Sequence, residues 1–292
     1  KALQAGEGCY ATLLTPQGHI VADLYALRMD DHVLLECDWL RKEPLRQTLE
    51  KYIIADQVEM GDLSGRLASL SVEGPQSGPL LTAAGAITLP GQELNHTWVE
   101  LAGTPVHVTR QSETGEEGYR LHFVAEYAQN VWDALVAQQK VVPWKPVGRA
   151  ALNILRTEAG VPWFGAELDE STLPPEAGLE ATAISYQKGC YVGQEIIERI
   201  RSRGHVNRKL TGLRLEAEPL PAAGAKLLAG GKEAGHLTTV VNSPALGGPI
   251  ALGYVRRQHL EPRTALELES GGTARVAELP FYRAARPALE RR

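Results

Sequence analysis

The stretch Lys188-Gly-Cys-Tyr-Val-Gly-Gln-Glu195, continued by Ile196-Ile-Glu-Arg-Ile-Arg-Ser-Arg203-Gly204, carries the strongest pattern in this chain of 292 residues. Its isoleucines recur at the spacing of one helical face, and Gly204 is a typical residue for a helix C-cap. The two glycines ahead of the isoleucines permit a tight turn. The pattern therefore predicts a turn that leads into the N-terminus of a helix.

Cys190 lies in that predicted turn and is the cysteine whose surroundings favour chemistry. The positive end of the helix dipole and the nearby Lys188 both favour a thiolate. A single cysteine is also often a small buried hydrophobe, so a reactive thiol and a core residue are both open. Cys9 and Cys37 lie in apolar runs and are expected in the core. Three cysteines without a Cys-x-x-Cys pair favour a reducing, cytoplasm-like compartment and argue against structural zinc.

A basic run follows the predicted turn, with no acidic residue between positions 199 and 209. It contains Arg199, Arg201, Arg203, His205, Arg208 and Lys209. One interpretation is an anion site for phosphate, polyglutamate or RNA. The other is a solvated helix face that pairs with Glu195 and Glu198 one turn earlier. No aromatic residues are interleaved, so an RNA-stacking surface is not expected.

A third candidate is the segment Thr114-Gly-Glu-Glu-Gly-Tyr119. Two glycines around two carboxylates are typical of a tight turn. A carboxylate held by such a turn could accept paired N–H donors from a heterocycle, with Tyr119 beside it.

The composition gives no argument for attraction to nucleic acids or membranes. The net charge is −5, and 43% of the residues are hydrophobic, which suits a chain that buries a sizeable core. The length fits one large or two modest domains. The sequence has neither the roughly 18 consecutive apolar residues of a membrane span nor a signal peptide.

Hydrophobic periodicity divides the chain into a mixed part and an all-β part. Two strands joined by a Pro16–Gly18 turn are expected over 10–36, and further strands over 65–72 and 97–109. Helices are expected over 38–51, 126–138 and 148–158, and an irregular connection over 161–187. From about 207, short strands alternate with turn residues, which predicts a small β-sandwich or barrel and a domain boundary near 205.

Residues 188–195 match the signature Lys-Gly-Cys-(Phe/Tyr)-x-Gly-Gln-Glu of the YgfZ family of folate-binding proteins at every fixed position. Residues 9–23 and 155–162 also resemble that family. The C-terminal strands are similar to the barrel that closes the glycine cleavage T-protein superfamily. The resemblance covers nearly the whole chain and implies an α+β fold. It implies a T-protein-like folate-binding domain over 1–205, a small antiparallel β-barrel over 206–283 and a tail over 284–292.

This resemblance implies a tetrahydrofolate-binding protein that acts in assembly or repair of iron–sulfur enzymes. Cys190 is then the thiolate, aided by Lys188, with a transient iron–sulfur cluster possible and iron–sulfur client or assembly proteins as partners. Neither a membrane nor a nucleic acid is expected as a partner. The implied location is the cytoplasm, or the mitochondrial matrix in a eukaryote.

The resemblance also implies which residues line the folate cavity. Tyr10 and Glu116 stand at positions that match folate-site residues of the superfamily, and the signature loop forms the rim. The expected folate-binding residues are Tyr10, Glu116, Tyr119, Gly189, Tyr191, Gly193, Gln194 and Glu195. Family members carry a further segment ahead of the position of Lys1, so a folate site argued from this sequence is expected to be incomplete.

The alternative is a folate-dependent aminomethyltransferase of the T-protein type. These enzymes have an Asp-Asp-Leu whose first Asp is the catalytic carboxylate, and here that position is Ala22. Asp23 is expected on the opposite face of the strand. The T-protein folate-site Arg is replaced by Leu152, and T-proteins lack a cysteine at position 190. These differences favour a protein that is not an enzyme. A binding module without folate, with Cys190 as a redox sensor, is a third possibility.

Overall fold

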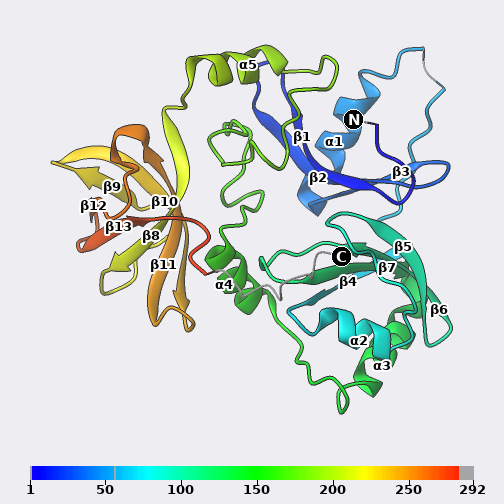
Figure 1. Cartoon of the computed structure of the whole chain (residues 1–292). Helices are drawn as coiled ribbons and strands as arrows, with labels where there is room; N and C mark the ends of the chain where they lie inside the picture. Colours follow the sequence, from blue (N-terminus) through cyan, green and yellow to red (C-terminus); the bar gives the residue numbers. More distant parts are fainter. Residues whose placement is uncertain (1, 56, 283–292) are drawn as a thin grey trace, which may run out of the picture.

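A computed structural model describes residues 2–55 and 57–282, apart from the side chain of Arg203. The predicted tail at 284–292 lies outside these residues. The fold is α+β, as expected: a three-stranded sheet, a four-stranded sheet with helices on one face, and a closed antiparallel barrel (Figure 1). No helix in the described ranges is both long and apolar enough to cross a membrane.

The first sheet has three antiparallel strands where the sequence predicted two. They are β1 (Gly8–Leu14), β2 (Ile20–Arg28) and β3 (Val33–Cys37), in that order. A short 3-10 turn, η1 (Trp39–Arg41), leads into helix α1 (Lys42–Glu50). One face of the sheet packs its small apolar side chains against Leu45 of this helix. The other face carries polar residues and turns away from α1.

The second sheet has the strand order β4-β7-β6-β5. Its strands are β4 (Leu67–Glu73), β5 (His96–Leu101), β6 (Thr104–Arg110) and β7 (Gly118–Val124). Helices α2 (Ser77–Ala83) and α3 (Ala128–Ala137), the latter preceded by η2 (Ala125–Tyr127), share a core with one face of this sheet. The strand expected over 97–109 is two strands, because Ala102 and Gly103 adopt positive φ and form a turn.

Helix α4 (Arg149–Ala159) ends at Gly160 in the left-handed conformation, as the sequence predicted. Between it and α5 (Gln194–Arg203), the described chain forms no helix or strand apart from one isolated bridge between Phe164 and Leu168. Gly193 precedes α5 and Gly204 ends it, both with positive φ. The turn-then-helix prediction for the signature is therefore confirmed.

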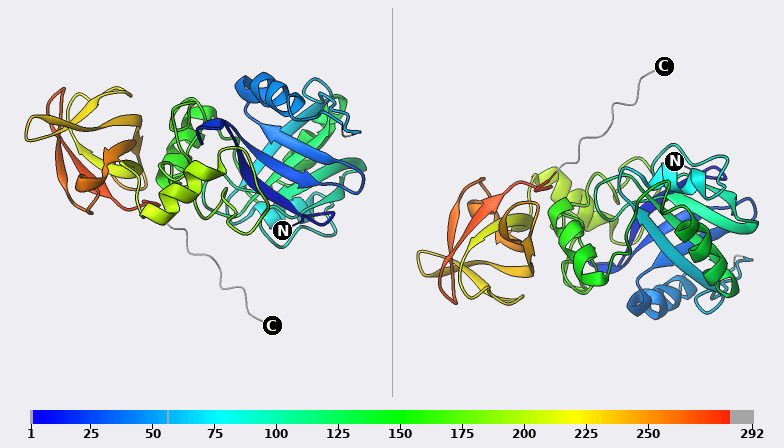
Figure 2. Two further views of the ribbon diagram at one scale, coloured as in Figure 1. Left: turned by 90° about the horizontal axis from the view of Figure 1, so that it is seen from above. Right: turned by 90° about the horizontal axis from the view of Figure 1, so that it is seen from below.

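The C-terminal barrel closes in the order β10-β11-β8-β13-β12-β9. Its strands are β8 (Arg208–Glu216), β9 (Lys226–Ala229), β10 (Lys232–Ser243), β11 (Gly248–Arg256), β12 (Ala265–Leu268) and β13 (Thr273–Ala277), with η3 (Arg257–His259) after β11. The domain division near residue 205 stays a prediction. Figure 2 shows α4, α5 and the irregular connection between the barrel and the two sheets.

Candidate functional site

A polar layer lies where the two sheets meet. The alternation of strand residues places Tyr10, Asp23, Tyr25 and Glu36 together on the face of the first sheet that turns away from α1. On the second sheet, Arg120 and His122 stand opposite the helix-covered face, and both approach Glu36 to 3.4 Å. We call this set of facing side chains the inter-sheet layer. Its members come from strands that are distant in sequence.

The hydroxyl of Tyr10 donates a hydrogen bond to Oδ2 of Asp23 over 2.9 Å. Burial raises the pKa of Asp23 above the usual value of a carboxyl group, and this effect outweighs the hydrogen bond, which lowers it. Burial and the neighbouring Asp23 also raise the pKa of Tyr10. The pair is therefore a desolvated carboxyl group held in place by a phenol, an arrangement suited to proton transfer.

The position of this pair corrects the sequence argument about Ala22. Ala22 is fully buried in the apolar cluster that faces α1, with Leu24 and Leu45. A carboxylate at position 22 would point into that core. Because Asp23 shares its face with Tyr10, the carboxylate that reaches the inter-sheet layer is the one this chain retains. The absence of an acidic residue at position 22 therefore does not argue against an enzyme.

Glu113 and Arg120 join the inter-sheet layer to the irregular connection. The guanidinium of Arg120 is hydrogen-bonded to Oε1 of Glu113 and lies 3.4 Å from Glu36. The other oxygen of Glu113 accepts a hydrogen bond of 3.1 Å from the indole of Trp163, over which Arg156 stacks at 4.3 Å. Sequence reasoning missed this network, although the segment at 114–119 lies directly beside it.

Several buried polar atoms of the layer and its neighbours make no hydrogen bond within the described residues. They include Nδ1 of His122, Oγ1 of Thr109 and both side-chain atoms of Gln111; Oε2 of Glu36 and Nε of Arg120 have only the ion-pair contacts of 3.4 Å given above. Buried groups of this kind are normally satisfied by water or a ligand. The layer and its neighbours therefore offer hydrogen-bonding groups to a ligand that carries several donors and acceptors.

The two residues predicted from the segment at 114–119, Glu116 and Tyr119, lie in different surroundings. Glu116 is half-buried and accepts no hydrogen bond in the described part, so its carboxylate is available. Tyr119 is on the helix-covered face of β7, in the core, where its hydroxyl donates to Glu117. Burial raises the pKa of Tyr119 to about 12. Tyr119 thus faces away from the Tyr10–Asp23 pair.

The signature loop docks α5 onto the turn between β1 and β2. Gly193 lies so close to this turn that a Cβ would meet the carbonyl oxygen of Thr15 at 2.7 Å. Oε1 of Gln194 accepts a hydrogen bond from the backbone N–H of Tyr191, which steadies the turn. Gly193 and Gln194 of the signature therefore have structural roles in this turn.

The remaining signature residues are at the surface. Lys188, Gly189, Cys190 and Glu195 are exposed, and the Lys188 ammonium lies 4.6 Å from the centre of the Tyr191 ring. Within the described residues, no three His, Cys, Asp or Glu side chains gather as a metal site. Nothing in the surroundings of Cys190 therefore indicates a cluster-binding site.

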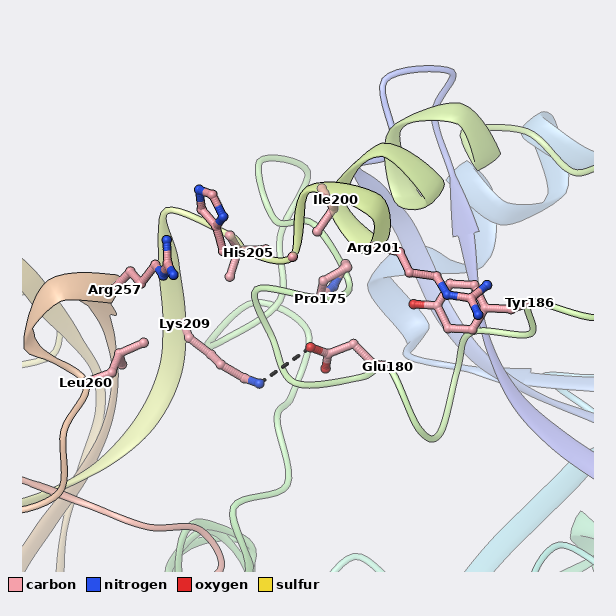
Figure 3. Close-up of a pocket in the computed structure, with 11 residues that line it drawn as sticks. Pro175, Glu180, Tyr186, Ile200, Arg201, His205, Lys209, Arg257 and Leu260 are labelled. Atoms are coloured by element: carbon pink, nitrogen blue, oxygen red, sulfur yellow. Dashed lines mark hydrogen bonds and ion pairs between the residues drawn. The ribbon is translucent and has the colours of Figure 1, made fainter.

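A second candidate site is a pair of adjoining hollows between α5 and the barrel. The first has a volume of about 360 Å³, and Figure 3 shows Arg201 and Tyr186 on one side of it and Lys209 and Arg257 on the other. The second, of about 910 Å³, is lined by further arginines of the barrel. Much of the predicted basic run borders these hollows; the Arg203 side chain lies outside what the structure describes.

The fold and site define a two-part protein, in which an α+β unit carrying a half-buried carboxyl–phenol pair is followed by a small barrel. Residues 1–188 match the family described as GCVT N-terminal domain, and residues 208–283 match the glycine cleavage T-protein C-terminal barrel domain. The chain belongs to this glycine cleavage T-protein family.

Named relatives and a solved structure agree with this assignment. The chain is 31% identical to the aminomethyltransferase of Saccharopolyspora erythraea over 288 residues, which cover 97% of this chain and 78% of the relative. It is 32% identical to that of Thermotoga neapolitana over 287 residues, with 97% and 78% covered. The glycine cleavage system aminomethyltransferase T of Bartonella henselae has a similar structure, with a TM-score of 0.82 at 26% identity, covering 96% of this chain and 77% of that one.

These relatives correct the predicted function. The superfamily part of the resemblance is confirmed, but nothing in the comparisons is specific to the YgfZ family. The prediction of an iron–sulfur assembly or repair factor is wrong, because relatives that match 96–97% of this chain are aminomethyltransferases. The same finding leaves the expected cluster and the expected iron–sulfur partners without support. The prediction gave too much weight to Cys190, which is exposed, and to Ala22, which faces the core.

Proposed function

We propose that this protein is a tetrahydrofolate-dependent aminomethyltransferase. It would move a methylene group from an aminomethyl thioether on a carrier arm to tetrahydrofolate and release ammonia. The observation that carries the proposal is the half-buried Tyr10–Asp23 pair on the inner face of the first sheet. The family assignment and the aminomethyltransferase relatives support it.

The chemistry requires two protons to move. In the overall reaction, the two N–H bonds of tetrahydrofolate are replaced by bonds to the bridging methylene, and the two protons end on the released ammonia and on the carrier thiol. A carboxyl group whose pKa is raised by burial can accept a proton from a folate amine and return it to a leaving group. The hydroxyl of Tyr10 holds the Asp23 carboxylate in one orientation for that exchange. We assign Asp23 as the acid–base group and Tyr10 as its partner.

The residues around this pair suit a folate. A pterin is a flat ring with several N–H donors, which carboxylates accept well. Glu116 accepts no hydrogen bond within the described residues, and Nδ1 of His122 and the side chain of Gln111 are buried and make none there either. The rings of Tyr10 and Tyr25 lie 5.1 Å apart beside Asp23 and offer an aromatic surface. Of the residues predicted to bind folate, the proposal keeps Tyr10 and Glu116 in the site.

The signature residues receive a different role in this proposal. Tyr191, Gly193 and Gln194 build the turn that holds α5 against the first sheet, and Gly189 and Glu195 belong to its exposed rim. No chemistry is required of Cys190 or Lys188, since Asp23 and Tyr10 supply the acid–base groups. Tyr119 is left out because it faces the core.

Two measurements test the proposal. Titration with tetrahydrofolate, followed by intrinsic fluorescence, should show saturable binding. Incubation with tetrahydrofolate and an aminomethylated lipoyl carrier protein should release ammonia and form methylenetetrahydrofolate in equal amounts. Saturable binding without ammonia release would reject the transferase activity, and no saturable binding would reject the proposal as a whole.

A further inference from the structure

Glu36 is the carboxylate of the inter-sheet layer that is least neutralised by its neighbours. It stands directly opposite Tyr25 on the next strand of the first sheet. Its contacts with Arg120 and His122 are both 3.4 Å long, which is longer than a normal charged hydrogen bond. Oε2 of Glu36 makes no hydrogen bond within the described residues. A ligand with N–H donors therefore finds an open carboxylate here.

The positive charge of Arg120 is directed mainly at Glu113. The Arg120 guanidinium is hydrogen-bonded to Oε1 of Glu113, whereas its Nε makes no hydrogen bond in the described part of the chain. Two carboxylates thus share one guanidinium. Burial raises the pKa of Glu36, but the contact with His122 and the charge of Arg120 outweigh this effect and hold the pKa below its ordinary value. Glu36 is therefore ionised at neutral pH, and the layer favours a cation.

Two buried side chains on the facing sheet add oxygen acceptors. Thr109 stands directly opposite Arg120 and is fully buried, yet its Oγ1 has no hydrogen-bond partner among the described residues. Gln111 follows on the same edge of the layer, is 3% exposed, and neither of its side-chain polar atoms is paired there. Buried groups of this kind normally bind water or a ligand. Acceptors for one small donor group thus come from both sheets.

Aromatic rings and partial exposure define the kind of cation. The rings of Tyr10 and Tyr25 lie 5.1 Å apart beside Glu36, and aromatic faces attract cations. The side chains of Arg120 and Glu36 are 18% and 23% exposed, so a group about the size of water can reach them. Over residues 2–55 and 57–282, no three His, Cys, Asp or Glu side chains gather to hold a metal ion. These features suit an ammonium group, which is small and carries several N–H donors.

We propose that the inter-sheet layer binds the amine nitrogen that leaves during the transfer, as an ammonium group held by Glu36. This inference rests on the proposed function, because that reaction supplies the amine. Asp23 and Tyr25 are alternate residues of β2 on one face, about 7 Å apart, and Glu36 is opposite Tyr25. The carboxylates of Asp23 and Glu36 can therefore flank one small group. Thr109 accepts a further N–H of that group from the second sheet.

The step balances with Asp23 as the proton carrier. Asp23 takes the proton of the attacking folate N–H and passes it to the amine of the aminomethyl group, which becomes an ammonium group. The folate nitrogen bonds to the methylene carbon, and the bond from that carbon to the ammonium nitrogen breaks. Its electron pair stays on the nitrogen, which leaves as ammonia. Glu36 neither gains nor loses a proton and acts as a positioning residue.

The reverse reaction tests this role, because ammonia is then a substrate. The protein is supplied with methylenetetrahydrofolate, a reduced lipoyl carrier protein and ammonium chloride at constant ionic strength. Glu36→Gln should raise the KM for ammonium about tenfold and leave kcat and the KM for methylenetetrahydrofolate within about twofold of wild type, because only ammonium binding loses a charged partner. The matched control is Glu117→Gln, whose carboxylate contacts Tyr119 and Arg110 instead, and it should leave all three constants unchanged.

Competing cations test the recognition of N–H donors. Methylammonium should compete with ammonium, whereas potassium and tetramethylammonium, which have no N–H donors, should not. Equal inhibition by methylammonium and potassium would overturn the assignment, and so would an unchanged KM for ammonium in Glu36→Gln. If Glu36→Gln fails to fold, Thr109→Val decides, since it keeps the size of the side chain and removes one acceptor. It should raise the KM for ammonium about threefold, and an unchanged KM would overturn the assignment.

The outcomes remain separate from those of the proposed function. If the wild-type protein turns over in neither direction, the proposed function fails, and ammonium binding is then measured by itself. Ammonium chloride is titrated in parallel with potassium chloride and followed by intrinsic fluorescence, since the indole of Trp163 donates to Glu113 beside the layer. Saturation by ammonium alone, weakened in Glu36→Gln, would support the ammonium site. No saturation, or equal saturation by potassium, would overturn it.

Discussion

Arg156 and Glu167 form an ion pair of 2.7 Å in which the side chains are 1% and 0% exposed. Arg156 belongs to α4 and Glu167 to the irregular connection. The Arg156 guanidinium also donates to Oγ1 of Thr239 on barrel strand β10, over 2.8 Å. This pair therefore joins the barrel to the part of the chain that carries the Tyr10–Asp23 site. The same guanidinium stacks on Trp163, and the Trp163 indole donates a hydrogen bond to Glu113 beside the inter-sheet layer.

We expect Glu167→Ala to lower the free energy of unfolding by about 3–5 kcal/mol, because it leaves the Arg156 charge buried and unpaired. Denaturant titration measures the effect. The control is Glu216→Ala, which removes the exposed partner of Arg275 and should change the unfolding free energy little, because solvent screens this pair. A loss at Glu167 no larger than that at Glu216 would show that the buried pair does not hold the two parts together.

Asp23→Asn tests the acid–base assignment. The amide can still accept the hydrogen bond from Tyr10 but cannot take up a proton. We expect turnover to fall by about 10²–10⁴-fold, with a much smaller change in tetrahydrofolate affinity. Since burial raises the pKa of Asp23, wild-type turnover should decline on the acid side as this carboxylate becomes protonated. That decline should be missing from the residual activity of the variant, and near-normal turnover of the variant would refute the assignment.

Ala22→Asp is the matched control for the choice of strand face. It places a carboxylate in the apolar cluster around Leu24 and Leu45. We expect a loss of about 3–5 kcal/mol in unfolding free energy and no gain in turnover, either alone or combined with Asp23→Asn. Restored turnover in the double variant would show that position 22 does face the site.

The two glycines of the signature should respond differently to alanine. Gly193 has a φ of +83°, and its added Cβ would meet a backbone oxygen at 2.7 Å, so Gly193→Ala should cost about 1–3 kcal/mol. Gly189 has open space around it, so Gly189→Ala should stay within about 0.5 kcal/mol of wild type. Thermal unfolding of both variants checks this. Similar losses would contradict the docking role of the turn.

Many of the regular elements could be predicted from the sequence because their signals are local, although helix α2 and strand β7 were not expected. The hydrophobic period of α4, the Gly160 cap and the even spacing of the barrel strands each lie within one short stretch. The inter-sheet layer could not be predicted in this way. Glu36, Glu113 and Arg120 are isolated charged residues in sequence, and only the packing of two sheets brings them together.

The choice between positions 22 and 23 shows a second limit of prediction from sequence. Neighbouring strand residues point to opposite faces, so a correct strand still leaves open which face forms the site. That choice depends on α1, which covers the Ala22 face, and on Tyr10, which pairs with Asp23 on the other. The signature at 188–195 led to the wrong function although every fixed position matches. Its residues mostly build a turn, and the match says nothing about which side chains face the site.

Acid should destabilise the protein through His107, which is buried on the face of the second sheet that carries His122. Burial and the neighbouring His96 and His122 lower the pKa of His107 from 6.5 to about 3, and Glu36 opposes this shift. His107 shares a hydrogen bond of 2.9 Å with His96, and exposed His32 adds a small repulsion. Between pH 6.5 and about 3, the unfolded chain therefore binds a proton that the folded protein does not.

The contribution of His107 to stability is thus complete above pH 6.5 and is lost progressively as the pH falls towards 3. The slope for one proton is up to about 1.4 kcal/mol per pH unit. We expect the unfolding free energy of His107→Gln to fall less steeply than that of wild type across this window. His259→Gln, on η3 at the barrel surface, should keep the wild-type slope. Parallel curves for wild type and His107→Gln in urea titrations from pH 7 to 4 would show that His107 binds its proton equally well in the folded and the unfolded protein.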